Sequence, residues 1–221
     1  MNFASLLQPP FPRLARIRIP LIFSLFWLAT AGAVLAILWR VENVPGTRLA
    51  VPGSWPATSG ISRTPGMPEL VMFAHPKCPC TRAGMGELAR IMAQCQGRVG
   101  VQVMFYKPDG VLADWARTDL WRSAEAIPGV AVREDEDGAE AAIFGATTSG
   151  FVVLYDGAGR LDFSGGITAE RGHAGDNDGE DAIIAILNGK KAARETTPVL
   201  GCSLAQLTGP ARMAKGAVCQ K

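Results

Sequence analysis

The feature that most constrains this chain is an uncharged apolar run near its start. Residues 19–39 (IPLIFSLFWLATAGAVLAILW) contain no charged side chain. As a helix that rises about 1.5 Å per residue, such a run crosses the hydrocarbon layer of a bilayer, which takes about 20 apolar residues. The run therefore predicts one transmembrane helix over residues 19–39. The alternative is a cleaved signal peptide, because Ala29-Thr30-Ala31 resembles a cleavage site, but the run extends further than the apolar part of a signal peptide usually does.

The charges beside this run predict its orientation. Three arginines stand between residues 13 and 18 with no acidic residue among them, whereas Glu42 dilutes the arginines that follow the run. By the positive-inside rule, residues 1–18 lie in the cytoplasm and the rest of the chain lies outside. We therefore expect a single-pass protein of the inner (cytoplasmic) membrane, anchored through residues 19–39, with its domain on the periplasmic or extracytoplasmic side.

The rest of the chain divides by composition. Residues 40–67 are rich in Pro, Gly, Ser and Thr, which is typical of a flexible tether. A folded domain is expected over residues 68–190, followed by a C-terminal tail over residues 191–221 for which no structure is predicted. The net charge is only +2, with 19% charged residues. Because no dense basic run appears, we expect no nucleic-acid partner.

Apolar runs and helical spacings alternate within the expected domain. Short apolar runs predict buried strands, and two of them flank the turn Asp156-Gly157, which indicates a β-hairpin. The early strand–helix–strand order gives parallel pairing and the hairpin gives antiparallel pairing. We therefore expect an α/β fold with a mixed sheet and helices on both faces. Strands are predicted over residues 69–74, 99–106, 129–133, 151–155 and 160–163, and helices over residues 81–94, 112–126, 139–144 and 178–187.

The motif Cys78-Pro79-Cys80 stands between the first strand and the first helix of this domain. A helix N-terminus stabilises a thiolate through its unpaired N–H groups and its dipole. Proline suits the first helical turn, where its missing N–H would be unpaired in any case. We expect Cys78 to be the nucleophile, exposed at the helix entrance. Cys80 would then resolve a mixed disulfide or form the internal bond.

The surroundings and the spacing of this pair modify its expected chemistry. Lys77, Arg82 and His75 add positive charge, which would lower the pKa of the thiols further. Residues at i and i+2 of a helix do not face each other, so a Cys78–Cys80 disulfide requires a turn and would be strained. Strain raises the reduction potential, and such a pair would act as an oxidant or isomerase rather than as a strong reductant.

The chain has five cysteines, an odd number. Cys95 ends the first helix of the domain and is expected to be a buried small hydrophobe. Cys202 and Cys219 lie in the tail. A Cys202–Cys219 bond is one possibility, and a Cys80–Cys202 bond, which would replace the one between Cys78 and Cys80, is another.

Several segments together resemble a group of bacterial membrane-anchored thioredoxin-like proteins, some of them labelled RedB. FAHPKCPC at residues 73–80 is similar to the thioredoxin segment in which a strand ends shortly before the first active-site cysteine. HPKCPCTRA, FSGGIT, RGHAGDN and TPVLGC carry the narrower resemblance. It implies a thioredoxin-like fold over about residues 68–190, with the redox pair at the first strand-to-helix junction. Two departures stand out: the cysteines are one residue closer than in Cys-x-x-Cys, and Gly150, after Ser149, replaces the thioredoxin cis-proline.

The leading hypothesis is a membrane-anchored thiol–disulfide oxidoreductase that acts on exported protein thiols through catalytic Cys78 and Cys80. It needs no cofactor, and its partners would be exported proteins or a membrane redox partner. A second hypothesis is a copper-binding or copper-delivering thioredoxin-fold protein that uses Cys78, Cys80 and His173, because thiolates and imidazole suit Cu(I). His173 and Arg171 lie in a Gly-rich loop over residues 164–178. A non-catalytic tethered interaction domain and a peroxide-reducing relative are also compatible with the sequence.

Overall fold

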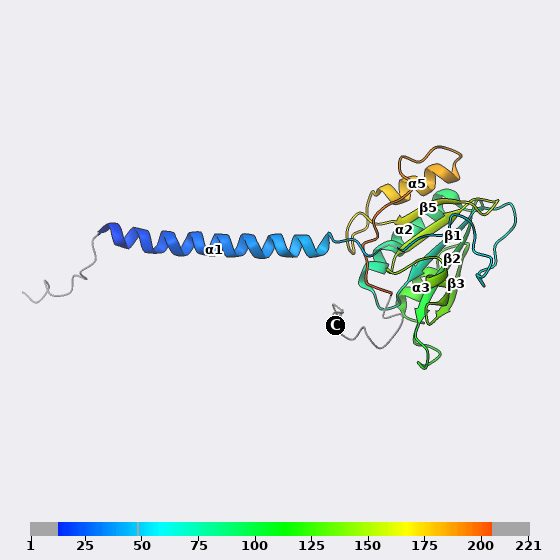
Figure 1. Ribbon diagram of the computed structural model, residues 1–221, viewed down its shortest axis with the longest axis horizontal. Helices are drawn as coiled ribbons and strands as arrows, with labels where there is room; N and C mark the ends of the chain where they lie inside the picture. The colour runs from blue at the N-terminus through cyan, green and yellow to red at the C-terminus, as the bar shows by residue number, and fades with distance from the viewer. Residues whose placement is uncertain (1–12, 48, 205–221) are drawn as a thin grey trace, which may run out of the picture. The chain divides into compact units, whose positions relative to one another are not determined.

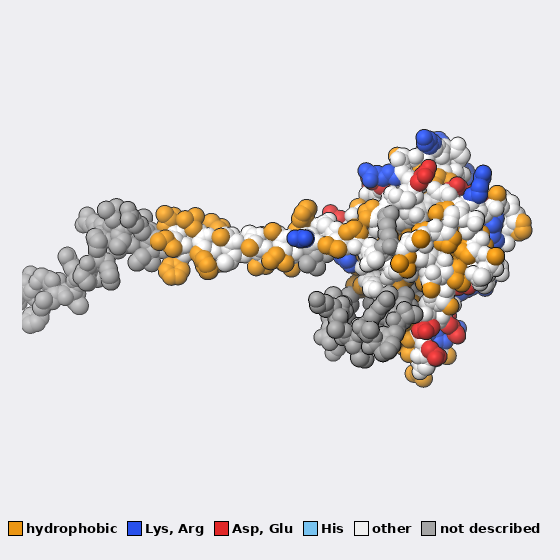
Figure 2. All heavy atoms as spheres, viewed as in Figure 1, with side chains coloured by type: hydrophobic (Ala, Val, Ile, Leu, Met, Phe, Trp, Pro, Cys, Tyr) orange, Lys and Arg blue, Asp and Glu red, His pale blue; other side chains and the backbone are white. Residues whose placement is uncertain are grey.

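The computed structural model describes residues 13–47 and 49–204. The chain forms two compact units, Met1–Asn43 and a second unit that begins at Val44. The first unit holds helix α1 (Arg13–Glu42) (Figure 1). Its segment Pro20–Arg40 is long and apolar enough to cross a membrane, and Figure 2 shows apolar side chains along its surface. A helix of this length and composition could be a membrane span or a signal sequence.

The second unit is built on a five-stranded sheet with the strand order β3-β2-β1-β4-β5 (Figure 1). The three strands on one side pair in parallel: β1 (Glu69–Ala74) with β2 (Gly100–Lys107), and β2 with β3 (Val130–Glu136). The hairpin strands β4 (Phe151–Tyr155) and β5 (Leu161–Gly166) pair antiparallel, and β4 is also antiparallel to β1. The mixed α/β sheet predicted from the order of elements is confirmed, and it agrees with the thioredoxin-like fold that the resemblance implies.

Helices cover both faces of the sheet, as predicted. Helices α2 (Pro79–Cys95), α3 (Asp119–Glu125) and α5 (Asp178–Leu187) pack their apolar side chains into one core. On the opposite face the short helix α4 (Ala139–Ile143) contributes to a second core. Strand β1 is buried along its whole length because it lies in the middle of the sheet with apolar layers above and below.

Six of the nine predicted elements have different bounds in the structure, and α3 and β3 are two of them. The helix expected over residues 112–126 begins only at Asp119, because Thr118 takes an extended backbone conformation and residues before it form turns. The Thr118 hydroxyl donates to the carbonyl of Pro76 (2.9 Å), which ties this region to the loop before the cysteines. Strand β3 continues to Glu136, beyond the end predicted at residue 133, and the ammonium of Lys107 pairs with Glu134 (2.8 Å) in this extension.

The N-terminal segment before β1 differs from the flexible tether expected over residues 40–67. Trp55 packs edge-on against Phe144 and Tyr155, with ring centroids 5.3 and 5.2 Å apart. Ile61 is buried in the same core. Helix α4 is too short to cover its face of the sheet, and apolar side chains of this segment occupy the remainder.

The end of the described chain also folds back onto the sheet. Residues 195–204, called the C-terminal strap below, begin beside β5, where Thr196 forms a parallel bridge with Ser164. Val199 and Leu204 are then buried in the core on the α4 side. The strap belongs to the segment predicted as a tail without structure, and residues 205–221 lie outside the described residues.

Candidate functional site

Cys78 and Cys80 lie where the sequence predicted them, at the passage from β1 into α2. Cys78 is the N-cap of the helix with an extended backbone (φ −88°, ψ 118°), and Pro79 is the first helical residue. The amide of Thr81 donates to the Cys78 carbonyl (3.1 Å), and the Cys78 amide donates to the carbonyl of His75 (3.1 Å). The Cys78 side chain therefore leaves the backbone at the positive end of the α2 dipole.

The exposure of the Cys78 thiol differs from the expected one. Cys78 is only 1% exposed, whereas Cys80 is half-buried. The prediction that Cys78 is exposed at the helix entrance is wrong, because the C-terminal strap lies against its sulfur. Burial of Cys78 means that a substrate reaches this sulfur only through its neighbours or after the strap moves.

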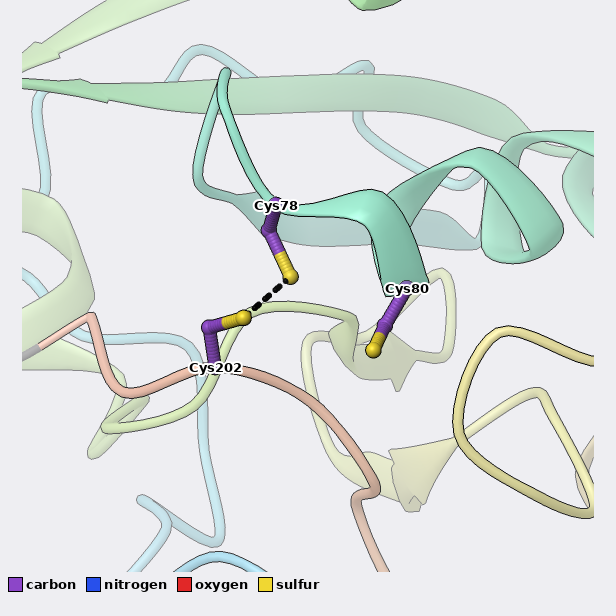
Figure 3. A group of neighbouring side chains, drawn as sticks. All are labelled: Cys78, Cys80 and Cys202. Atoms are coloured by element: carbon purple, nitrogen blue, oxygen red, sulfur yellow. Dashed lines mark hydrogen bonds between the residues drawn. The ribbon is translucent and has the colours of Figure 1, made fainter. Parts of the chain in front are cut away.

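The strap brings a third cysteine into the site. The Sγ atoms of Cys202 and Cys78 lie 2.8 Å apart and share a hydrogen bond (Figure 3). All three sulfurs, including that of Cys80, lie within 4.8 Å of one another. Figure 3 shows Cys78 at the entrance to α2 and Cys80 in its first turn, with Cys202 opposite them on the strap. No disulfide joins the cysteines of the described part of the chain, and Cys219 lies outside it.

Cys202 is the site residue that sequence reasoning missed. The sequence suggested a bond to Cys80 or to Cys219; in the structure the sulfur of Cys202 contacts that of Cys80 and forms its shortest contact with Cys78. The sequence did contain a signal for Cys202, because this residue ends TPVLGC, one of the motifs that carry the resemblance. Because Cys78 and Cys202 are 124 residues apart in the chain, no local sequence pattern could predict their contact.

Backbone hydrogen bonds fix the position of Cys202. The amide of Ser149 donates to the Cys202 carbonyl (2.8 Å), and the amide of Leu204 donates to the Thr147 carbonyl (2.8 Å). Between these bonds, Thr148 and Ser203 form an antiparallel bridge. The strap therefore lies beside the residues that precede β4 as a short added strand.

Ser149 and Gly150 occupy the place where the resemblance expected a cis-proline. Gly150 has φ +91°, a conformation that suits glycine, and its amide donates to the Phe73 carbonyl (2.8 Å). The Ser149 hydroxyl accepts from the amide of His75 (2.8 Å) and lies 2.7 Å from the hydroxyl of Thr81. The described residues contain no cis peptide bond. Ser149 thus connects β1, α2 and the strap at a single point.

Hydrogen bonds among the thiols set the charge of the cluster. The hydrogen bond with Cys202 contributes most to lowering the pKa of Cys78 far below its ordinary 9.0, the one with Cys80 comes second, and burial opposes them. For Cys80, contact with Cys202 acts to lower the pKa, but the Cys78 sulfur and burial outweigh it, and the pKa is raised. The negative charge of the cluster therefore resides on Cys78.

The three cations expected around the thiolate contribute less than predicted. Burial lowers the pKa of His75, so its imidazole is held neutral. The ammonium of Lys77 lies over the ring of Trp115, 4.4 Å from its centroid. Arg82 forms an ion pair with Asp119. Neighbouring thiols rather than these side chains are the main cause of the ionised state of Cys78.

The Gly-rich loop after the hairpin supplies one residue to the site. The Arg171 guanidinium donates to the carbonyl of Gly201 (2.6 Å), directly before Cys202 in the strap, and its charge acts to lower the pKa of Cys80. His173, in contrast, has a side chain that is 72% exposed and lies 3.6 Å from Glu170. Among the described residues, the cluster of metal-binding side chains contains the three cysteines without His173.

Comparison with known proteins supports the fold. No protein-family model matches the chain, and no curated protein matches it. A hypothetical protein from Sinorhizobium meliloti is 22% identical, with 73% of this chain and 93% of that chain covered and a TM-score of 0.52. An uncharacterized conserved protein from Geobacillus kaustophilus is 16% identical, with coverages of 74% and 93% and a TM-score of 0.53. At these identities the similarity is one of fold.

A third similar structure has a described activity. It is a secreted Mycobacterium tuberculosis disulfide oxidoreductase homologous to E. coli DsbE, 17% identical to this chain. The matched region covers 57% of this chain and 83% of that chain, with a TM-score of 0.41. The chemistry of the present site therefore depends on the arrangement of its own three cysteines rather than on this likeness.

Proposed function

We propose that this chain is a membrane-anchored thiol–disulfide oxidoreductase that acts on exported proteins through the cluster of Cys78 and Cys80. The observation that carries the proposal is the sulfur of Cys78 at the N-terminus of α2, 2.8 Å from a second sulfur, and the lowered pKa of Cys78 agrees with it. The thiolate is the nucleophile of disulfide exchange. The site therefore holds the reactive form of one cysteine beside thiols that can accept or release a bond to it.

The exchange follows from this arrangement. A thiolate of the cluster attacks one sulfur of a substrate disulfide, which forms a mixed disulfide and releases the other substrate sulfur as a thiolate. A second cysteine of the cluster then attacks the mixed disulfide, which closes an internal disulfide and releases the reduced substrate. Two electrons pass from the protein dithiol to the substrate. The reverse sequence oxidises a substrate dithiol.

Anchoring and placement outside the cytoplasm are part of the proposal. The apolar segment Pro20–Arg40 supports an anchor, and the arginines before it support an outward-facing domain. Such a compartment permits disulfides, and the resemblance to the RedB-like group agrees with this placement. A tag at the N-terminus of the expressed chain should stay on the full-length protein in washed membranes. A shortened, untagged protein in the soluble fraction would instead identify residues 19–39 as a cleaved signal.

Thiol counting in glutathione redox buffers tests the activity. The detergent-solubilised full chain is equilibrated, quenched with acid and labelled with a maleimide mass tag. We expect two thiols to disappear together over one range of glutathione potential, and Cys95→Ser, the matched control, to behave in the same way. Cys78→Ser should lose this paired transition. If the native chain keeps all its thiols across the whole range, the proposal is wrong.

Binding of a soft metal ion is the second candidate, because three sulfurs converge at one point. Thiolates suit Cu(I), and Cys202 takes the place that the sequence hypothesis gave to His173. Two sulfurs bound to one ion at about 2.3 Å lie roughly 4 Å apart, whereas those of Cys78 and Cys202 lie 2.8 Å apart. The geometry thus favours sulfur–sulfur chemistry. Anaerobic titration with Cu(I) decides: stoichiometric binding lost in Cys202→Ser but kept in His173→Ala would support the metal site, and its absence would exclude it.

A further inference from the structure

The C-terminal strap is attached to the domain at points along its length, and Cys202 is held within it. Near its start, the amide of Ser164 donates to the carbonyl of Glu195 (3.1 Å). In its middle, the amide of Gly46 donates to the carbonyl of Val199 (2.9 Å). The bonds to Thr147 and Ser149 described above fix its end. The strap is therefore a built part of the site, and the sulfur of Cys202 is directed at Cys78 by the backbone.

Gly201 allows the strap to approach this closely. A Cβ atom at this position would overlap the carbonyl oxygen of Ser149. Because that carbonyl is backbone, it has little freedom to move aside, so a side chain at position 201 would push the strap outward. The approach of Cys202 to the helix thus depends on glycine immediately before it.

Two internal disulfides are conceivable for Cys78, and the geometry distinguishes them. A bond to Cys80 would close a very small ring across the first helical turn, where side chains at i and i+2 point apart. A bond to Cys202 needs only that two sulfurs now 2.8 Å apart approach to about 2.05 Å. It would also close a loop between positions 124 residues apart, and long loops favour the crosslinked native state.

Exposure then determines which sulfur meets the substrate. Cys78 is buried, whereas Cys202 is half-buried. In disulfide exchange the incoming thiolate needs access to the sulfur that it attacks, and the sulfur with the more stable thiolate leaves faster. The cluster stabilises the thiolate on Cys78. Attack at Cys202 with Cys78 as the leaving group satisfies both requirements.

We infer that Cys202 is the substrate-exchanging cysteine of this site and that the oxidised protein carries a Cys78–Cys202 disulfide. This inference rests on the proposed function, and the substrate class is a polypeptide dithiol. A substrate thiolate attacks the sulfur of Cys202; the bond to Cys78 breaks, and Cys78 leaves as a thiolate. The second substrate thiol is deprotonated by solvent and attacks the substrate sulfur of the mixed disulfide, which closes the substrate disulfide. Cys202 leaves as a thiolate that takes up a proton. The substrate loses two electrons and the protein gains them.

Disulfide mapping of the full chain in detergent tests this inference. The protein is oxidised with glutathione disulfide, quenched in acid, digested and analysed by mass spectrometry. We expect a Cys78–Cys202 crosslink in the native chain and in Cys80→Ser. A Cys78–Cys80 crosslink that persists in Cys202→Ser, or a Cys202–Cys219 crosslink, would overturn the inference while leaving the proposed oxidoreductase in place. The absence of any internal disulfide would overturn both.

Trapping and strap displacement provide a second test. In Cys78→Ser, glutathione disulfide should form a persistent adduct on Cys202, because the thiolate that would remove it is missing. Gly201→Ala should slow closure of the internal disulfide at least tenfold. Its matched control is Gly86→Ala on α2, where a Cβ meets open space among the described residues. An adduct on Cys80 instead, or equal closure rates in the two glycine variants, would contradict the assignment of Cys202.

Discussion

The two ends of helix α2 carry cysteines whose pKa values are shifted in opposite directions. Cys78 at the N-terminus and Cys95 at the C-terminus are both buried, with exposures of 1% and 0%. Hydrogen bonds from neighbouring thiols lower the pKa of Cys78, whereas burial raises the pKa of Cys95. The prediction that Cys95 is a small buried hydrophobe is confirmed. Burial alone therefore does not decide the chemistry of a cysteine in this domain.

The difference comes from what surrounds each sulfur. Cys95 packs in the apolar core beside the sheet, at the helix end whose dipole disfavours a negative charge. Cys78 lies at the opposite end of the dipole, with Cys202, Cys80 and Thr81 as hydrogen-bonding partners. The variants below should separate these two environments, and they are ordered by the size of the expected effect.

Removal of the Cys78 sulfur should have the largest effect. Cys78→Ser is expected to abolish turnover of a peptide disulfide, because the cysteine with the strongly lowered pKa, which would remove the adduct from Cys202, is gone. Cys95→Ser at the other end of the same helix should leave the rate within about twofold. The rates are compared by stopped-flow fluorescence of a quenched peptide disulfide. Equal losses of rate in the two variants would contradict the claim that only the cysteine at the N-terminal end of α2 takes part in the exchange.

Loss of the strongest hydrogen-bond partner should have the next largest effect. Cys202→Ala is expected to move the pKa of Cys78 upward, toward the ordinary 9.0, and by more than Cys80→Ala does, since Cys202 is the leading cause of its depression. Cys202→Ser, which keeps a donor, should lie between Cys202→Ala and the native chain. Thiolate absorbance at 240 nm as a function of pH measures the shift. No change in Cys202→Ala would show that the strap does not stabilise the thiolate.

The stability of the reduced protein should depend on pH in opposite ways at the two helix ends. The pKa of folded Cys78 lies below its unfolded value, so its ionisation stabilises the fold fully above pH 9.0, and this contribution is lost as the pH falls toward the folded pKa. The pKa of folded Cys95 is raised, so its contribution is complete below pH 9.0 and is lost as the pH rises above that value. Urea unfolding of Cys78→Ala and Cys95→Ala, each relative to the native chain at pH 6 to 10, measures both trends. If the two contributions to the free energy of unfolding changed with pH in the same direction, the opposite pKa shifts of Cys78 and Cys95 would be contradicted.

The smallest expected effect is the packing contribution of Cys95. Cys95→Ala removes one buried sulfur, and we expect the free energy of unfolding at pH 7 to fall by about 1–2 kcal/mol. The thiolate titration of Cys78 should be unchanged in this variant. A shifted titration would mean that the two ends of α2 are coupled through the helix.

Local patterns predicted the parts of this molecule whose structure is determined locally. Strand β1 and helix α5 have the bounds that their apolar runs and helical spacing indicated. The motif Cys78-Pro79-Cys80 was correctly placed at the start of a helix, because proline and the preceding strand define that junction. In these cases neighbouring residues contain enough information.

Features that depend on distant contacts were not predicted. Pro- and Gly-rich composition indicated correctly that the segment around Trp55 forms no regular element, but it did not reveal that the segment packs on the sheet. The contact of Cys202 with Cys78 and the burial of Cys78 depend on the path of the strap, which no local periodicity encodes. His173 illustrates the converse, since chemistry suggested a metal ligand and the fold leaves it exposed.

The ionised state of Cys78 underlies both the proposed function and the assignment of Cys202, and titration of thiolate absorbance at 240 nm measures it. In the reduced full chain, we expect one thiolate whose protonation lies well below pH 9.0. This step should be absent from Cys78→Ser and present in Cys95→Ser. If the native chain and Cys78→Ser both gained thiolate absorbance only near the ordinary cysteine pKa, the start of α2 would hold no activated sulfur, which would contradict the proposed chemistry.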